Sequence, residues 1–110
     1  ELWSRTYGGS GTDQGRHIAE TLDQGYIISG YTDSYGSTGG FNFWLIKTDS
    51  NGGLEWQEYY GGRGSDRAFC GLQASDGGYA IVGQSNTGGS TGMDILLVKT
   101  DDTGNADISE

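Results

Sequence analysis

The chain of 110 residues contains no proline, a single cysteine (Cys70), and only 6 lysines and arginines against 15 aspartates and glutamates. A single cysteine excludes an internal disulfide framework. The net charge of −9 disfavours nucleic acid and anionic lipid as partners, because their phosphate groups repel an acidic protein. The longest apolar runs, of which residues 43–46 are one, are far too short to span a bilayer, so we expect no membrane insertion.

Glycine, in contrast, supplies 22 of the 110 residues. The Gly-X-Y period of collagen is missing, and 3 tryptophans, 7 tyrosines and 3 phenylalanines favour a packed core over a low-complexity chain. The sequence opens at Glu1 without a methionine, and no signal-peptide pattern follows. We therefore expect a mature or excised segment that forms one small domain.

The chain is built from two copies of one unit. The motif D-x-G-Y-x-I-x-G at 23–30 recurs at 76–83, an offset of 53 residues, and K-T-D at 47–49 recurs at 99–101, an offset of 52. Each copy of about 50 residues alternates short β-branched and aromatic segments with glycine-containing turns, which predicts a four-stranded antiparallel meander. The strands expected in the first copy cover residues 16–21, 25–32, 42–48 and 54–60.

The segment 42–48 indicates how the sheets pack. Apolar side chains occupy both of its faces, Phe43 and Leu45 on one and Trp44 and Ile46 on the other. Because a sheet with one wet face alternates apolar and polar residues, this sheet is expected to be buried on both sides. We therefore predict an all-β fold, a β-propeller of four-stranded antiparallel blades with two blades per chain. A β-sandwich of the two sheets is the alternative.

Two blades cannot close a ring, because propellers have about 4–8 blades. We expect residues 1–14 to supply an outer strand and loop, residues 15–62 the first blade, and residues 63–110 a second blade whose last strand is incomplete. The strand at residues 2–7 then completes the second blade of a neighbouring copy, so that strand exchange closes the ring. The expected partner is the chain itself, as a homotetramer or homotrimer.

Three motifs carry a family resemblance: W-x3-Y-G-G-x-G-x-D, D-x-G-Y-x-I-x-G and K-T-D-x-x-G. Together they resemble the tandem repeats of large secreted and cell-surface proteins of bacteria and archaea, which are taken to build β-propellers. The stretch D-x-x-G-x-x-x-W at 49–56 also resembles the tryptophan-docking turn of quinoprotein-type propellers, whereas the second copy has Ile108 at the tryptophan position. The resemblance implies a secreted or cell-surface repeat scaffold, and it implies no single activity.

The three tryptophans, Trp3, Trp44 and Trp56, fall within predicted strands and are expected to pack between blades. Ligand binding, where it occurs, is expected at four residues near the loops of one propeller face. Asp13 and Asp66 recur at matching positions, where each is expected to accept hydrogen bonds from a backbone turn, with a ligand or calcium contact as the alternative. The other two are Asp33 and Tyr35, in the longer glycine-, serine- and threonine-rich loop.

Catalytic and metal motifs are sparse. His17 is the sole histidine, no G-x-S-x-G accompanies it, and its counterpart in the second copy is Cys70; both are expected to be structural. The turns at 49–52 and 101–104 resemble the start of a calcium loop, but the glutamate twelve positions along is missing. Plain turns without a cofactor are therefore expected, with calcium as the alternative.

These observations favour a non-enzymatic extracellular module that acts as a self-assembling scaffold or as a surface that binds glycan or protein. One alternative is a hydrolase or lyase whose site forms at the centre of the ring from several chains. Another is an engineered or excised propeller fragment without an activity of its own. A plain loop face would favour the scaffold, whereas a convergent cluster of acids there would favour binding or catalysis.

Overall fold

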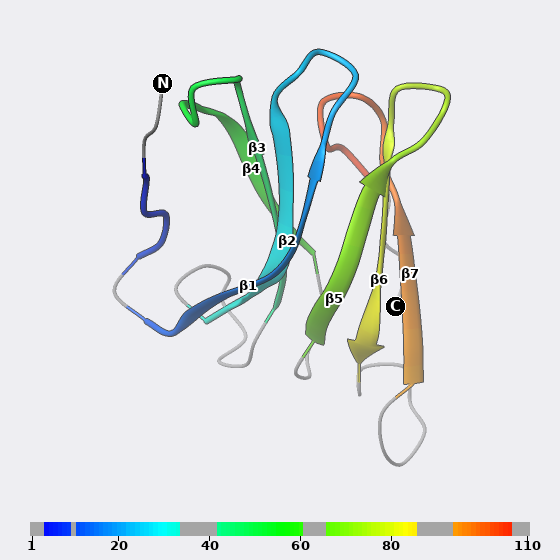
Figure 1. Ribbon diagram of the computed structural model, residues 1–110. Helices are drawn as coiled ribbons and strands as arrows, with labels where there is room; N and C mark the ends of the chain where they lie inside the picture. Colours follow the sequence, from blue (N-terminus) through cyan, green and yellow to red (C-terminus); the bar gives the residue numbers. More distant parts are fainter. Residues whose placement is uncertain (1–3, 10, 34–41, 61–65, 86–93, 107–110) are drawn as a thin grey trace.

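The computed structural model of the chain describes residues 4–9, 11–33, 42–60, 66–85 and 94–106. Within these ranges the chain forms two antiparallel sheets and no helix, and so no helix that could cross a membrane (Figure 1). This confirms the predicted all-β class. The strands are β1 (Asp13–Glu20), β2 (Tyr26–Thr32), β3 (Asn42–Thr48), β4 (Leu54–Tyr60), β5 (Asp66–Gln73), β6 (Tyr79–Ser85) and β7 (Asp94–Lys99).

Each sheet is a meander in which every strand pairs with its neighbour in the sequence. Sheet A has the order β1-β2-β3-β4, and sheet B has the order β5-β6-β7. The strand expected over 16–21 begins earlier, at Asp13, because a β-bulge between Gly15 and His17 lets pairing with β2 continue past the irregularity. Sequence alternation cannot reveal such a bulge, since the extra residue shifts the pattern by one.

The two sheets repeat the same register. His17 lies opposite Ser29 in sheet A, and their counterparts Cys70 and Val82 lie opposite each other in sheet B. The bulge recurs as well, between Ala68 and Cys70. The sequence repeat is therefore also a repeat of strand pairing, residue by residue.

Aspartate and glycine shape the turns. Asp49 accepts hydrogen bonds through Oδ1 from the backbone N–H groups of Asn51 and Gly53, both at 2.8 Å, and Gly52 has φ of +82°. In the second copy Asp101 and Gly104 play the same parts, with φ of +85° at Gly104. Left-handed backbone favours glycine, so this turn explains why both copies carry it at this position.

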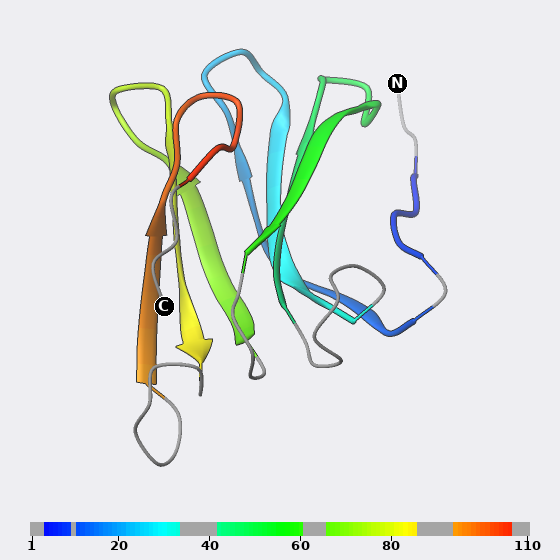
Figure 2. The same ribbon diagram turned by 180° about the vertical axis from the view of Figure 1, so that it is seen from behind.

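Sheets A and B pack face to face as two layers, visible in both views (Figures 1 and 2). We call the face of sheet A that meets sheet B its front face, and the face of sheet B that receives it the rear face of sheet B. Buried side chains from both form one core. The front face of sheet A contributes Ile27, Phe43, Leu45 and Tyr60, and the rear face of sheet B contributes Ala68, Tyr79, Ile81 and Val98.

The opposite faces point outward. The rear face of sheet A carries Ile18, Ile28, Trp44 and Ile46, and the N-terminal segment of residues 4–9 lies on that side (Figures 1 and 2). The front face of sheet B carries Leu72, Val82, Ile95 and Leu97. Because the strand registers repeat, each outward face is the sequence counterpart of a face that is buried between the sheets.

Candidate functional site

The outward front face of sheet B exposes several large apolar side chains. Its side chains are exposed by 50% at Leu72, 39% at Val82, 84% at Ile95 and 67% at Leu97. Val82 and Leu97 lie directly opposite each other on paired strands, so the apolar area is continuous across the sheet. Contiguous exposed apolar patches of this kind mark interaction surfaces.

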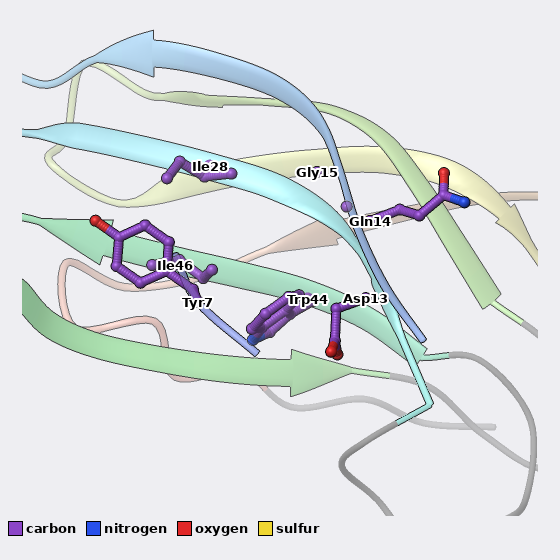
Figure 3. A pocket seen from close by; sticks show the side chains of 8 residues that line it. Tyr7, Asp13, Gln14, Gly15, Ile28, Trp44 and Ile46 are labelled. Carbon is purple, nitrogen blue, oxygen red and sulfur yellow. The ribbon is translucent and has the colours of Figure 1, made fainter. Parts of the chain in front are cut away.

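The rear face of sheet A contains a small open hollow of about 90 Å³ (Figure 3). Trp44, only 4% exposed, lines it and donates a hydrogen bond from Nε1 to Oε1 of Gln57 at 2.9 Å. Tyr7 approaches from the N-terminal segment and donates its hydroxyl hydrogen to the carbonyl of Gly52. The remaining lining residues are Asp13, Gln14, Gly15, Ile28, Gly30 and Ile46.

Asp13 lies at the edge of this hollow, but its carboxylate serves the backbone and a neighbouring strand. It accepts hydrogen bonds from the N–H of Gly9 at 3.2 Å through Oδ2 and from the hydroxyl of Thr32 through Oδ1. Asp33 behaves similarly, since its Oδ1 accepts a hydrogen bond of 2.6 Å from the N–H of Thr12. Each carboxylate thus accepts a hydrogen bond from a backbone N–H group of the loop before β1. For Asp13 this agrees with the turn-acceptor role that the sequence favours.

The side chains of the other two ligand candidates, Tyr35 and Asp66, are not among the described parts of the structure. Tyr35 lies outside the described residues. Asp66 begins β5, and only its backbone is described. Of the four candidates, the two whose side chains are described, Asp13 and Asp33, lie at one end of sheet A.

The tryptophans differ in position. Trp56 lies between the sheets, where its indole meets the ring of Tyr79 edge-on at 5.4 Å and covers the Cα of Gly104. Trp44 instead belongs to the outward rear face of sheet A. Trp3 lies outside the described residues.

A buried lysine on β3 links the β1–β2 turn to β4 and was not singled out from the sequence. Lys47 is 4% exposed in its side chain and forms ion pairs of 3.0 Å with Asp23 and Glu55. Its Nζ also donates to the carbonyl of Thr48 at 2.8 Å. Recurrence of D-x-G and K-T-D in both copies was the available signal, because Lys99 pairs with Asp76 at the same positions of sheet B.

Hydrogen bonding shifts the pKa values of Asp23 and Lys47. Hydrogen bonds from Thr21 and Lys47 lower the pKa of Asp23 to about 2. Burial alone would lower the pKa of Lys47, but its hydrogen bonds to Glu55 and Asp23 outweigh burial, and the pKa is raised above its ordinary value. Asp23 and Lys47 therefore both stay ionised at neutral pH, and their ion pair holds the β1–β2 turn against β3.

The described residues offer little for catalysis. His17 is exposed on β1 and Cys70 is half-buried on β5, at counterpart positions of the two sheets. Within the described ranges, no group of three or more histidine, cysteine, aspartate or glutamate side chains is placed to hold a metal ion. What the arrangement offers is apolar surface for protein contact.

Tyr7 and Tyr60 form a matched pair that the sequence repeat suggested only as part of Y-G-G. Tyr60, at the end of β4, donates its hydroxyl hydrogen to the carbonyl of Gly104 in the turn after β7. Tyr7 makes the same bond to Gly52 in the β3–β4 turn. Residues 4–9 thus sit against sheet A as the end of β4 sits against sheet B.

Comparison with known proteins gives no assignment. No protein-family model matches the chain, and no curated protein matches it in sequence.

Proposed function

We propose that this chain is a non-enzymatic β-propeller repeat module of a secreted or cell-surface protein, and that it works as a scaffold that assembles with further copies of itself. One observation carries the proposal. The front face of sheet A is buried by sheet B, whereas its counterpart on sheet B is an exposed apolar face with Leu97 at 67% and Ile95 at 84% exposure. In a second copy, the rear face of sheet A is the sequence counterpart of the rear face of sheet B. It can therefore cover the exposed front face of sheet B in the first copy, as sheet B covers sheet A within one chain.

Assembly of this kind is head-to-tail. The contact joins two different surfaces, so it forms a ring if the rotation between copies closes. With two blades per chain, three or four chains give six or eight blades, within the range of about 4–8 found in propellers. We favour the four-chain ring, as a homotetramer.

The N-terminal segment supports the same arrangement. The hydrogen bond from Tyr7 to Gly52 matches the bond from Tyr60 to Gly104. This match supports a role for the N-terminal segment as the outer strand of a preceding blade. Sheet B has three described strands, and β7 is its last. Residues 2–7 of a second copy are then the strand that pairs with β7, and Trp3 packs where the second repeat carries Ile108.

The scaffold is favoured over ligand binding or catalysis. Asp13 and Asp33 accept hydrogen bonds from loop backbone and from Thr32, which leaves less of each carboxylate for a sugar or a cation. A glycan or protein ligand would then bind the assembled loop face. Calcium at the turn of Asp49 competes with the two N–H groups that its Oδ1 already accepts.

Light scattering on a sizing column tests the proposal. We expect a mass three or four times 11.7 kDa. Leu97→Lys should shift the chain toward monomer by placing a charge in the contact. Leu22→Lys is the matched control, because Leu22 is 77% exposed in the β1–β2 turn and should leave the mass unchanged. A monomer at the highest soluble concentration, with both sheets folded by circular dichroism, would overturn self-assembly.

Deletion of residues 1–7 tests the exchanged strand separately. We expect the shortened chain to lose the defined mass and to aggregate, since an uncovered strand edge invites irregular pairing. If the shortened chain forms the same oligomer as the full chain, strand exchange is wrong while face-to-face stacking stands.

A further inference from the structure

Two small residues from the two sheets, Ser29 on β2 and Gly71 on β5, lie against each other. A Cβ added at Gly71 would lie 3.3 Å from the Cβ and 3.2 Å from the Oγ of Ser29. Ser29 is 1% exposed, and within the described structure its hydroxyl has no hydrogen-bond partner. Since no polar contact accounts for it, Ser29 is suited to this place by its small size.

The counterparts of this pair lie on the two outward faces. Val82 is the counterpart of Ser29, because Val82 lies opposite Cys70 as Ser29 lies opposite His17. Ile18 takes the place of Gly71, because Ile18 lies opposite Ile28 as Gly71 lies opposite Ile81. Both are apolar, and they are exposed by 39% and 59%.

Given the assembly proposed above, on which this inference rests, we propose that a second copy docks with its Ile18 directly against Val82. The register is that of the contact between sheets A and B within one chain. The spacing differs, because two branched side chains cannot approach as closely as a serine and a glycine. The contact between copies is therefore wider at this point than the contact within a chain.

The surrounding side chains fit this register. Leu97 and Ile95 are the counterparts of Leu45 and Phe43, which pack into the core between the sheets. Their place in the second copy is the hollow on the rear face of sheet A, lined by Trp44. Trp44 is the counterpart of Leu96 in sheet B and is larger than it. Ile95 is smaller than its counterpart Phe43, so the larger residue on the receiving face compensates for the smaller residue that packs against it.

Disulfide trapping tests the register directly. Cys70 is first replaced by serine, because it pairs with Val82 across the strands and could compete. The Ile18→Cys, Val82→Cys variant is then oxidised gently and run on a non-reducing gel. Disulfides require Cβ atoms about 3.5–4.5 Å apart, a distance slightly above the 3.3 Å of the internal pair. We expect covalent oligomers that stop at the ring size, and at least tenfold less linkage in either single-cysteine variant.

Two further pairs calibrate the result. Ser29→Cys with Gly71→Cys is the internal counterpart and should link within one chain, without a change in mass. Ile18→Cys with Ile95→Cys is the mismatched control, because Ile95 lies on the same face as Val82 but opposite Gln84. It should link no more than the single variants.

The outcomes separate this register from assembly itself. If light scattering gives an oligomer but the Ile18–Val82 pair links no better than the Ile18–Ile95 pair, the register is wrong and the scaffold proposal stands. If the chain is a monomer and neither pair links, both proposals fail. Equal and strong linkage of both pairs would indicate sliding apolar association and would also overturn the register.

Discussion

Lys47 is a buried cation whose two carboxylate partners are exposed to water. This difference in burial determines how much each substitution in the cluster should lower the free energy of unfolding. The lysine side chain is 4% exposed, whereas those of Asp23 and Glu55 are 59% and 44% exposed. Removing the lysine leaves two carboxylates that water can reach. Removing the negative charges leaves an ammonium group inside the protein with the Thr48 carbonyl as its remaining backbone acceptor.

The expected free energies of unfolding follow from that asymmetry. Lys47→Met removes a desolvated charge together with its hydrogen bonds and fills the same space, so it should destabilise by only about 1 kcal/mol. Asp23→Asn with Glu55→Gln should cost about 3 kcal/mol, because a buried charge loses its counter-charges while the amide oxygens still accept hydrogen bonds. Adding Lys47→Met to that double variant should restore most of the lost stability.

Urea unfolding followed by tryptophan fluorescence measures these differences, at one fixed protein concentration because assembly adds to apparent stability. Lys99 and Asp76 are the matched control in sheet B, with side chains 48% and 64% exposed. Lys99→Met should leave the urea midpoint unchanged, since exposed ion pairs contribute little. A larger cost for Lys47→Met than for the carboxylate double variant would refute the reasoning.

Three further predictions follow from the described contacts. The hydrogen bonds from Thr21 and Lys47 lower the pKa of Asp23 to about 2. The stability that ionised Asp23 adds is therefore present above its unfolded-state pKa of about 3.9, and it is lost as the pH falls from about 4 toward 2. Asp23→Asn should flatten that part of a profile of melting temperature against pH. Tyr60→Phe should cost about 1–2 kcal/mol in urea because the buried Gly104 carbonyl loses its donor, and since burial raises the pKa of Tyr60, the variant should show an almost unchanged phenolate absorbance at pH of about 11. Trp56→Ala should cost about 3 kcal/mol by calorimetry, and an unchanged transition would contradict its packing between the sheets.

Much of the fold could be predicted from residue pattern. Apolar side chains at both parities of 42–48 predicted a strand buried on both sides, and every residue of β3 is buried. Residues 95–98 of β7 carry the same apolar pattern, yet Ile95 and Leu97 are exposed. The apolar pattern along a strand indicates which side chains need to be buried, but it does not indicate which surface buries them. Within the described chain, no second sheet packs on the front face of sheet B.

The contacts between the sheets were harder to predict. Lys47 was placed in the strand 42–48, but its ion pairs were not predicted, because a lysine beside threonine and aspartate gives no sign of burial in a sequence. Its partners Asp23 and Glu55 come from the β1–β2 turn and from β4. Likewise, nothing local marks Ser29 and Gly71 as neighbours, since only the stacking of two sheets brings them together.

The connectivity of the sheets has a consequence for folding kinetics. Within each sheet every strand pairs with its neighbour in sequence, so the pairings close short loops and give a low contact order for an all-β chain. Each meander can then form in sequence order, and docking of the two sheets comes last. Stability in such a stack grows with the number of docked units, as in one-dimensional repeat arrays. The unfolding cooperativity of this chain should therefore rise with each further unit that is joined to it.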